Sequence, residues 1–250
     1  MKKTSYSAER EEDSFKRHCR LSELLIGEDQ HVFDVGANIG QSVSRYRDKF
    51  PNCFITSFEP NPQAFSLLER SWGGVPGVTL NRIALADYTG HASFFRTRVS
   101  AGSSLLKPTE RIIELSSECN YDYETINVPT MTLDHYCQIH NVRYIDILKM
   151  DVQGSELGVL QGAEKLLREG MIKLIYSEVI LAETYENQTR FIDIVSYLNK
   201  LNYEIWDIGS FLYTRNDRIW AANLIFVHTS AANLLEAKPK YNCEIEHDSI

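Results

Sequence analysis

The stretch from His31 to Gly40 constrains the fold of this chain more than any other part of it. The stretch starts as an apolar run of strand length, ends in small residues that include Gly36, and leads directly into a helix-like segment. This order predicts a strand, a tight turn and a helix. In a sheet of mostly parallel strands, the turn after the first strand lies at the carboxyl edge, where nucleotide-like ligands bind. We therefore expect a ligand site at this turn.

A carboxylate follows the next apolar strand at the distance expected of a ribose-binding residue. Residues 54–58 have a strand pattern and lead to Glu59, about twenty residues beyond Gly40, which is the offset of the acidic residue that binds ribose hydroxyls in nucleotide-binding folds. A glycine turn alone, or an acidic strand end alone, is a weak signal, because either is often purely structural. Their order and spacing together favour a nucleoside site.

The spacing of the glycines indicates which nucleoside fits. Dinucleotide sites use the pattern G-x-G-x-x-G, so that a pyrophosphate can lie against the backbone of the turn. Here three residues separate Gly36 from Gly40, and Asn38 occupies the position of a middle glycine. S-adenosylmethionine carries no phosphate and does not need that close approach. The pattern favours S-adenosylmethionine, with an NAD-dependent oxidoreductase as the less favoured alternative.

Strand and helix patterns alternate along the chain and predict an α/β fold with a single doubly wound, mostly parallel seven-stranded sheet. The 250 residues are enough for one domain with a large core, whereas two domains would be cramped. Seven segments have strand patterns, namely residues 31–35, 54–58, 78–86, 144–150, 174–179, 203–208 and 223–228.

Three segments fall outside this alternation. Residues 1–30 are polar and then weakly helical, which predicts an N-terminal helical cap or lid before the main domain of residues 31–229. Residues 91–131 interrupt the alternation before the fourth strand, with an extra strand and then a polar, aromatic loop over residues 121–128. Because long insertions in compact domains are usually functional, we expect this insertion to be a substrate lid. Residues 230–250 show no clear period and predict a loosely packed tail.

The composition argues against several classes of protein. A net charge of -8 and a pI near 5.4 disfavour nucleic-acid binding, which usually needs a basic surface. No apolar run is long enough to span a membrane, and the acidic residues that follow the first few positions do not fit a signal peptide. The five cysteines are odd in number and contain no C-x-x-C pair, which is typical of reduced thiols. We expect a cytoplasmic protein.

Six short motifs follow one another along the chain: Phe33 to Gly40, Phe58 to Asn61, Ala84 to Asp87, Ser103 to Leu105, Thr132 to Asp134 and Lys149 to Glu156. In sequence and order they resemble the FkbM family of S-adenosylmethionine-dependent methyltransferases. The resemblance covers roughly residues 30–230. It implies that residues 31–229 form a class I, Rossmann-like methyltransferase domain in which the last strand runs antiparallel. It does not specify a substrate.

The resemblance also implies which residues bind the methyl donor. They are Asp34, Gly36, Ala37, Asn38, Gly40, Glu59, Pro60 and Asp87. The resemblance places Asp87 near the adenine, but the run from Asp87 to Gly90 is also typical of a type I turn, with Asp at its first position and Gly at its fourth. Both interpretations of Asp87 stay open.

Two carboxylates at the ends of later strands are the candidates for catalysis. Asp151 follows the fourth strand, at the edge where ligands bind in this architecture; a helix cap or a pair with Lys149 would be its structural alternatives. Glu178, near the end of the fifth strand, is the second candidate. Glu156 is less favoured, because the helix dipole already explains a carboxylate at a helix N-terminus. We predict no metal site from spacing, although Asp151, Asp134 and Glu178 could converge in space.

These observations predict an enzyme that moves a methyl group from S-adenosylmethionine to a hydroxyl of a small molecule, sugar or glycan. Such an in-line displacement needs alignment of donor and acceptor and removal of the hydroxyl proton. A nucleoside-binding module without catalysis stays open as an alternative, because a binding site survives when catalytic residues do not. A sugar-nucleotide transferase is disfavoured, since no D-x-D motif follows a predicted strand.

Overall fold

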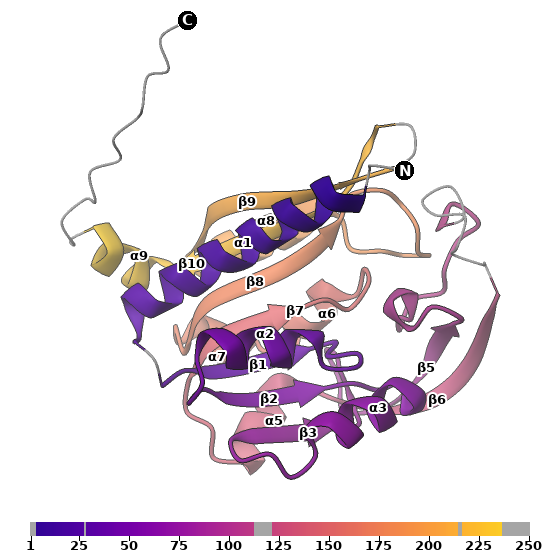
Figure 1. Ribbon diagram of the computed structural model, residues 1–250, viewed down its shortest axis with the longest axis horizontal. Helices are drawn as coiled ribbons and strands as arrows, with labels where there is room; N and C mark the ends of the chain where they lie inside the picture. Colours follow the sequence, from indigo (N-terminus) through magenta and orange to yellow (C-terminus); the bar gives the residue numbers. More distant parts are fainter. Residues whose placement is uncertain (1–3, 28, 113–121, 215–216, 237–250) are drawn as a thin grey trace, which may run out of the picture.

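The computed structural model describes residues 4–27, 29–112, 122–214 and 217–236 (Figure 1). Its centre is a seven-stranded sheet in the order β3-β2-β1-β7-β8-β10-β9. The strands are β1 (His31–Val35), β2 (Phe54–Phe58), β3 (Val78–Asn81), β7 (Ile145–Met150), β8 (Ile172–Ile180), β9 (Tyr203–Tyr213) and β10 (Ile219–His228). β10 pairs antiparallel with β8 and β9, whereas the other neighbours pair in parallel. The predicted sheet, with its last strand antiparallel, is confirmed.

Helices cover both faces of the main sheet. They are α2 (Gln41–Lys49) and α3 (Pro62–Trp72) on one face, and α5 (Leu133–Ile139), α6 (Glu156–Gln161), α7 (Glu164–Arg168) and α8 (Phe191–Asn199) on the other. Successive side chains of a strand point to opposite faces, so Val32 joins the core that contains Tyr46 of α2, whereas Phe33 joins the core that contains Tyr136 of α5. With both faces covered, the strand ends are the part of the sheet that a ligand can reach.

The predicted third strand is wrong in its extent. Residues 78–86 form two short strands, β3 and β4 (Ala84–Leu85), because the chain leaves the main sheet after Asn81. β4 pairs with β6 (Tyr123–Met131), and β6 pairs antiparallel with β5 (Gly90–Thr97). The predicted insertion therefore forms most of a second, three-stranded sheet. The loop predicted over residues 121–128 is strand from Tyr123 onward, and residue 121 lies outside the described residues.

The N-terminal segment forms a long helix, α1 (Thr4–Leu25), which lies along β9 and β10 (Figure 1). Phe15 and Cys19 of this helix are buried in the same core as Tyr46. The helix is thus packed onto the main sheet, and its function as a cap or lid stays a prediction. No helix in the described ranges is long and apolar enough to cross a membrane.

The C-terminal part of the chain is more regular than the sequence suggests. β9 and β10 extend beyond their predicted segments, because their pairing continues towards the turn that joins them. The chain then forms α9 (Thr229–Glu236), in which Ala231 and Ala232 are buried. A loosely packed tail is therefore wrong for residues 230–236, and residues 237–250 lie outside the described part of the chain.

Candidate functional site

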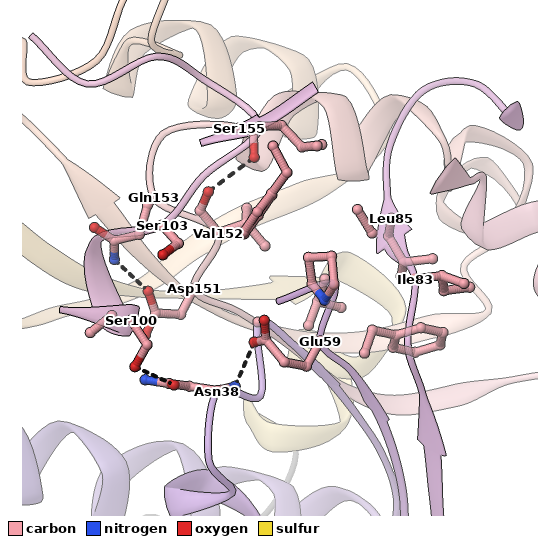
Figure 2. Close-up of a pocket in the computed structure, with 18 residues that line it drawn as sticks. Asn38, Glu59, Ile83, Leu85, Ser100, Ser103, Asp151, Val152, Gln153 and Ser155 are labelled. Carbon is pink, nitrogen blue, oxygen red and sulfur yellow. Dashed lines mark hydrogen bonds between the residues drawn. The ribbon is translucent and has the colours of Figure 1, made fainter. Parts of the chain in front are cut away.

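Three segments that follow neighbouring strands meet at the carboxyl edge of the main sheet. Gly36 follows β1, Glu59 follows β2 and Asp151 follows β7, and these strands are adjacent and parallel. All three residues line one cavity, which we call the strand-end cavity (Figure 2). Topology thus brings the glycine turn together with Glu59 and Asp151, two of the carboxylates that the sequence places at strand ends.

Gly36 lets the turn after β1 pass close to the end of β7. Its φ is 78°, and a Cβ at this position would lie 2.0 Å from the carbonyl oxygen of Asp151. The backbone N–H groups of Gly36 and Ala37 both donate to the carbonyl of Phe58, at 3.0 and 3.1 Å. The turn is therefore fixed against β2 on one side and β7 on the other, and only glycine fits at its first position.

Gly40 has a different surrounding from Gly36. It precedes α2 with a φ of 98°, and a Cβ there would lie 2.8 Å from the indole ring of Trp72 and 2.9 Å from Leu68. The residue lets the start of α2 pack against α3, and it does not line the strand-end cavity. This packing gives Gly40 a structural role, and its contact with a cofactor stays a prediction.

Glu59 faces the strand-end cavity from the end of β2 and is only 6% exposed. Its carboxylate accepts two backbone hydrogen bonds, Oε2 from the N–H of Asn38 and Oε1 from the N–H of Asn61, each at 2.8 Å. Burial raises the pKa of Glu59 to about 7, against the lowering effect of these bonds. Each oxygen has a second lone pair, so the carboxylate can still accept hydroxyl donors from a ligand.

Asn38 joins the glycine turn to the insertion. Its φ is 49°, a conformation that Asn tolerates better than most residues. Its Oδ1 accepts a hydrogen bond from the hydroxyl of Ser100 at 2.9 Å (Figure 2). Ser100 begins the short helix η1 (Ser100–Gly102) within the insertion. This hydrogen bond anchors the insertion to the turn. That the insertion acts as a lid stays a prediction.

The insertion also supplies an apolar wall that the sequence did not indicate. Phe94 and Leu105 line the strand-end cavity together with Ile83 and Leu85. The only available signal was indirect, since Leu85 and Leu105 lie in motifs of the family resemblance. Of the other predicted donor-binding residues, Asn38 and Pro60 line this cavity.

The lining of the strand-end cavity fits a nucleoside without a phosphate group. Glu59 offers acceptors for ribose hydroxyls, and the apolar wall offers a surface for a flat base. Among the described residues that line the cavity there is no lysine or arginine, so no side chain there neutralises a pyrophosphate. S-adenosylmethionine has this combination of groups, and the site fits it better than a dinucleotide.

Asp34 stabilises the turn indirectly, through Lys149. It is fully buried and forms an ion pair with Lys149, whose Nζ lies 2.9 Å from Oδ1. The same Nζ donates to the carbonyl of Gly36 at 3.1 Å. Burial alone would lower the pKa of Lys149, but the carboxylates of Asp34 and Asp151 raise it overall. Asp34 does not line the cavity, and it takes the pairing role with Lys149 that the sequence left open for Asp151.

The two predicted catalytic carboxylates are joined by one amide. Nε2 of Gln153 donates to Oδ1 of Asp151 at 2.7 Å and to Oε2 of Glu178 at 2.9 Å. Asp151 and Glu178 therefore share a single site across β7 and β8. The sequence did not indicate Gln153, which stands within the motif from Lys149 to Glu156 but carries no charge that would draw attention to it.

A second hollow adjoins the strand-end cavity, and we call it the neighbouring cleft. The two share Gly36, Asn38, Ala101 and Asp151. Beyond this junction, the cleft is lined by Ala37 and by side chains from four further elements, namely Phe15, Arg45, Tyr176, Glu178 and Asn223. Asp151 thus lines both spaces, whereas Glu178 lines only the cleft.

Three other acidic residues lie away from this junction. Asp87 is exposed and lines a separate depression beside α6, so its adenine contact stays a prediction. Glu156 is buried at the start of α6; burial raises its pKa to about 7, and its Oε1 accepts from the N–H of Gly154 at 3.1 Å. Asp134 accepts the first backbone N–H groups of α7 and does not converge with Asp151. Across the described ranges, no group of three His, Cys, Asp or Glu side chains is arranged as a metal site.

The chain is similar to known methyltransferases. Residues 34–205 match the family model of the methyltransferase FkbM domain. A 2-O-methyltransferase NoeI of Sinorhizobium fredii is 28% identical over 70% of this chain and 73% of its own length. A hexuronic acid methyltransferase AglP of Haloferax volcanii is 29% identical over 56% of this chain and 53% of its own length.

A solved structure supports the same fold. The crystal structure of a methyltransferase FkbM from Methylobacillus flagellatus superposes with a TM-score of 0.53 at 16% sequence identity. The match covers 82% of this chain and 47% of that one. This chain therefore spans about half the length of two of these three relatives.

Proposed function

We propose that this chain, which belongs to the FkbM methyltransferase family, transfers a methyl group from S-adenosylmethionine to a hydroxyl of a sugar. The family match over residues 34–205 confirms the predicted family, the methyltransferase class and the donor that this class uses. The sugar acceptor is the further step. It is supported by the names of the two relatives, which describe a 2-O-methyltransferase and a hexuronic acid methyltransferase.

One observation carries the proposal: the strand-end cavity and the neighbouring cleft meet at Asp151. A methyl transfer needs two binding spaces that open to each other at the reacting atoms. The strand-end cavity has the lining for the donor, and the cleft provides the second space. Asp151 stands at their junction, together with Gly36, Asn38 and Ala101.

Residues around the strand-end cavity would hold the donor. The Glu59 carboxylate would accept the ribose hydroxyls, and Leu85 and Phe94 would pack against the base. When bound, S-adenosylmethionine supplies an electrophilic methyl group on a positively charged sulfur. The glycine turn, held to β2 through the Phe58 carbonyl, keeps the backbone from occupying the space that the donor needs.

Asp151 would act as the general base. Its carboxylate would take the proton of the acceptor hydroxyl as the oxygen bonds to the methyl carbon, so that the leaving sulfur carries away its own electron pair and loses its charge. Glu178 lines only the cleft and would orient the acceptor through another hydroxyl. The Asn223 amide and the rings of Tyr176 and Phe15 would contact the polar and apolar sides of a sugar.

The remaining predictions keep their sequence basis. Absence of nucleic-acid binding follows from the net charge of -8. A cytoplasmic location follows from the cysteine pattern; Cys19, Cys53 and Cys137 are free and buried in the described part of the chain, while Cys119 and Cys243 lie outside it. Neither expectation changes the assignment of the site.

A labelled-donor assay tests the proposed function. Purified protein is incubated with S-adenosylmethionine labelled in its methyl group and with methyl glycosides of a neutral hexose, an N-acetylhexosamine and a hexuronic acid. We expect label on the oxygen of at least one glycoside, and calorimetric binding of S-adenosylhomocysteine without measurable binding of NAD. Donor binding without transfer to any glycoside would overturn the sugar acceptor and favour a binding module. Binding of NAD alone would overturn the methyltransferase.

A further inference from the structure

We propose that Gln153, which lines the strand-end cavity, is a positioning residue that holds the Asp151 and Glu178 carboxylates together. The inference rests on the proposed function, since it concerns the group that receives the hydroxyl proton. Gln153 lies in the loop between β7 and α6, is 8% exposed, and has a φ of 55°, in the left-handed region that a residue with a Cβ seldom adopts. A buried amide in an unfavourable backbone conformation needs an explanation beyond packing.

The amide uses both of its N–H donors on the two carboxylates. Nε2 carries two hydrogens, and its two partners are Asp151 Oδ1 at 2.7 Å and Glu178 Oε2 at 2.9 Å. The opposite end of the amide, Oε1, lies 3.3 Å from the hydroxyl of Tyr185. The two carboxylate acceptors beside Nε2 fix which end of the amide is nitrogen.

Folding alone does not explain this arrangement. Two carboxylates that face one point repel each other, and the nearby buried Lys149 cation attracts both, although its own ion pair is with Asp34. The shared amide offsets this repulsion by donating to both. Asp151 and Glu178 then act as one unit, in which the proton acceptor and the group that orients the hydroxyl keep a fixed separation. A stored cost of this kind is typical of a functional site.

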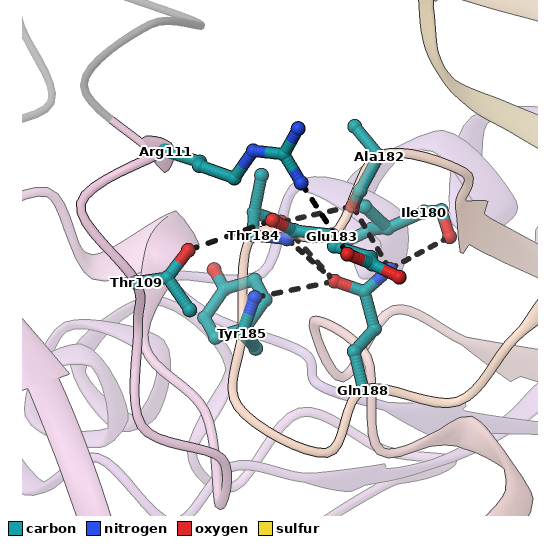
Figure 3. A network of polar contacts seen from close by, with 8 residues as sticks. All are labelled: Thr109, Arg111, Ile180, Ala182, Glu183, Thr184, Tyr185 and Gln188. Atoms are coloured by element: carbon teal, nitrogen blue, oxygen red, sulfur yellow. Dashed lines mark hydrogen bonds and ion pairs between the residues drawn. The ribbon is translucent and has the colours of Figure 1, made fainter.

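The loop between β8 and α8 holds Tyr185 in place for this task (Figure 3). The Gln188 side chain spans the loop: its Nε2 donates to the carbonyls of Ile180 and Ala182 at 3.0 and 2.9 Å, and its Oε1 accepts from the N–H of Thr184 at 3.0 Å. A loop tied through its centre in this way presents Tyr185 rigidly to Gln153.

The insertion contacts the same unit. The Tyr185 hydroxyl lies 2.9 Å from the carbonyl of Gly102, and the Ser104 hydroxyl donates to the carbonyl of Gln153 at 2.8 Å. Gln153 is therefore held by the insertion through its backbone and by the β8–α8 loop through its amide. Through Gln153, the insertion and the β8–α8 loop both help to fix the distance between the two carboxylates.

The first test measures melting temperatures and needs no methyl acceptor. It asks whether the Gln153 side chain contacts both carboxylates. In Gln153→Glu, a third carboxylate joins the pair, so the folded state holds a proton more tightly and loses stability as the pH rises. We expect Gln153→Glu to melt about 2–4 °C further below wild type at pH 8 than at pH 5. Gln138→Glu, which makes the same change at an exposed position on α5, should show no such pH dependence. An equal pH response in the two variants would overturn the proposed contact.

The second test reads turnover with the methyl glycoside that wild type labels fastest. In Gln153→Met, which keeps the volume but removes the donors, we expect kcat to fall by up to about 100-fold. Because Gln153 also lines the strand-end cavity, the affinity for S-adenosylhomocysteine is measured beside it and should fall by less than kcat. In Gln153→Glu, the acid limb of the pH–rate profile should move to higher pH. A change in the acceptor KM alone, or an unmoved profile, would assign Gln153 a merely structural or binding role.

Tyr185→Phe should act in the same direction with a smaller effect, because it removes the hydroxyl near Gln153 Oε1 and its bond to the Gly102 carbonyl but leaves both carboxylate contacts in place. The matched variant Tyr144→Phe lies at the opposite edge of the sheet, just before β7, and should leave kcat unchanged. If wild type labels no glycoside, the proposed function fails and the catalytic role of Gln153 fails with it, whereas the pH-dependent melting still decides whether the amide contacts both carboxylates.

Discussion

The strand-end cavity and the neighbouring cleft meet at Asp151 but are built in different ways. The cavity depends on backbone: Gly36 is fixed by close approach to β7, and Glu59 is held by two backbone N–H groups. The cleft depends on side chains from distant elements, among them Phe15 of α1 and Asn223 of β10. Under the proposed function, this difference predicts that donor binding depends mainly on the backbone of the strand ends and that acceptor choice depends on the side chains of the cleft.

The largest effect should come from the residue at the junction. Asp151→Asn keeps the shape of the side chain but removes the base, so turnover should fall by about two to four orders of magnitude. Because Glu59 and the apolar wall, and not Asp151, are proposed to hold the donor, the affinity for S-adenosylhomocysteine should stay within twofold. Asp29→Asn, at an exposed position before β1, serves as the control. Turnover near the wild-type rate would transfer the role of base to Glu178.

The next largest effect should come from Glu59 and should be a loss of affinity for the donor. Glu59→Gln removes charge-assisted hydrogen bonds to the ribose and should weaken S-adenosylhomocysteine binding by about 1.5–3 kcal/mol, which is more than tenfold. Glu69→Gln, exposed on α3, should leave the affinity unchanged. Isothermal titration measures both. An unchanged affinity in folded Glu59→Gln would mean that this carboxylate only organises the turn.

The raised pKa of Glu59 gives the same variant a pH signature. The value of about 7 lies above the roughly 4.3 of a solvated glutamate, so the folded protein holds this proton more tightly than the unfolded chain. Stability is therefore lost as the pH rises between these values. Glu59→Gln avoids that loss, and its stability relative to wild type should improve by as much as roughly 3 kcal/mol between pH 4.5 and 7. Denaturant unfolding at several pH values checks this, and a constant difference would contradict it.

A glycine pair separates close approach from backbone strain. Gly36 and Gly74 have nearly the same φ, 78° and 76°, but only at Gly36 would a Cβ meet backbone atoms. Both alanine variants lose stability because alanine is strained in the left-handed conformation. Gly36→Ala should lose about 1–3 kcal/mol more through overpacking. It should also weaken donor binding, unlike Gly74→Ala. Equal unfolding midpoints would mean that the turn can move away from β7 at no cost.

The smallest expected effect concerns the anchor of the insertion. Ser100→Ala removes the hydrogen bond to Asn38 and should weaken S-adenosylhomocysteine binding by about two- to tenfold, the range of one neutral hydrogen bond. Ser66→Ala, on the exposed face of α3, should have no effect. If Ser100→Ala instead changes only the acceptor KM, the insertion covers the cleft and not the donor.

The sequence predicted which strand ends meet at the strand-end cavity because the signals for them are local. A strand followed by Gly36, and a second strand followed by Glu59, are consecutive patterns, and parallel pairing then brings the two ends together. The same logic placed Asp151 at the edge. It could not indicate contacts between elements that are distant in sequence, such as the packing of Gly40 on Trp72 and the ion pair of Asp34 with Lys149.

The part that Gln153 plays between Asp151 and Glu178 escaped prediction for a physical reason. Gln153 contacts Glu178 and Tyr185 only because a left-handed backbone turns its amide towards β8 and because the loop after β8 folds back. Neither event leaves a periodic signal. The division of residues 78–86 between two sheets is similar, since the pairing partner β6 lies more than thirty residues further along the chain.

The separation of donor and acceptor spaces at Asp151 is tested most directly by one set of calorimetric titrations. S-adenosylhomocysteine is titrated into wild type, Glu59→Gln and Asp151→Asn under identical conditions. The account predicts a loss of more than tenfold in Glu59→Gln and a change within twofold in Asp151→Asn. Equal losses in the two variants would contradict it, because Asp151 would then belong to the donor site and the cleft would have no base at its entrance.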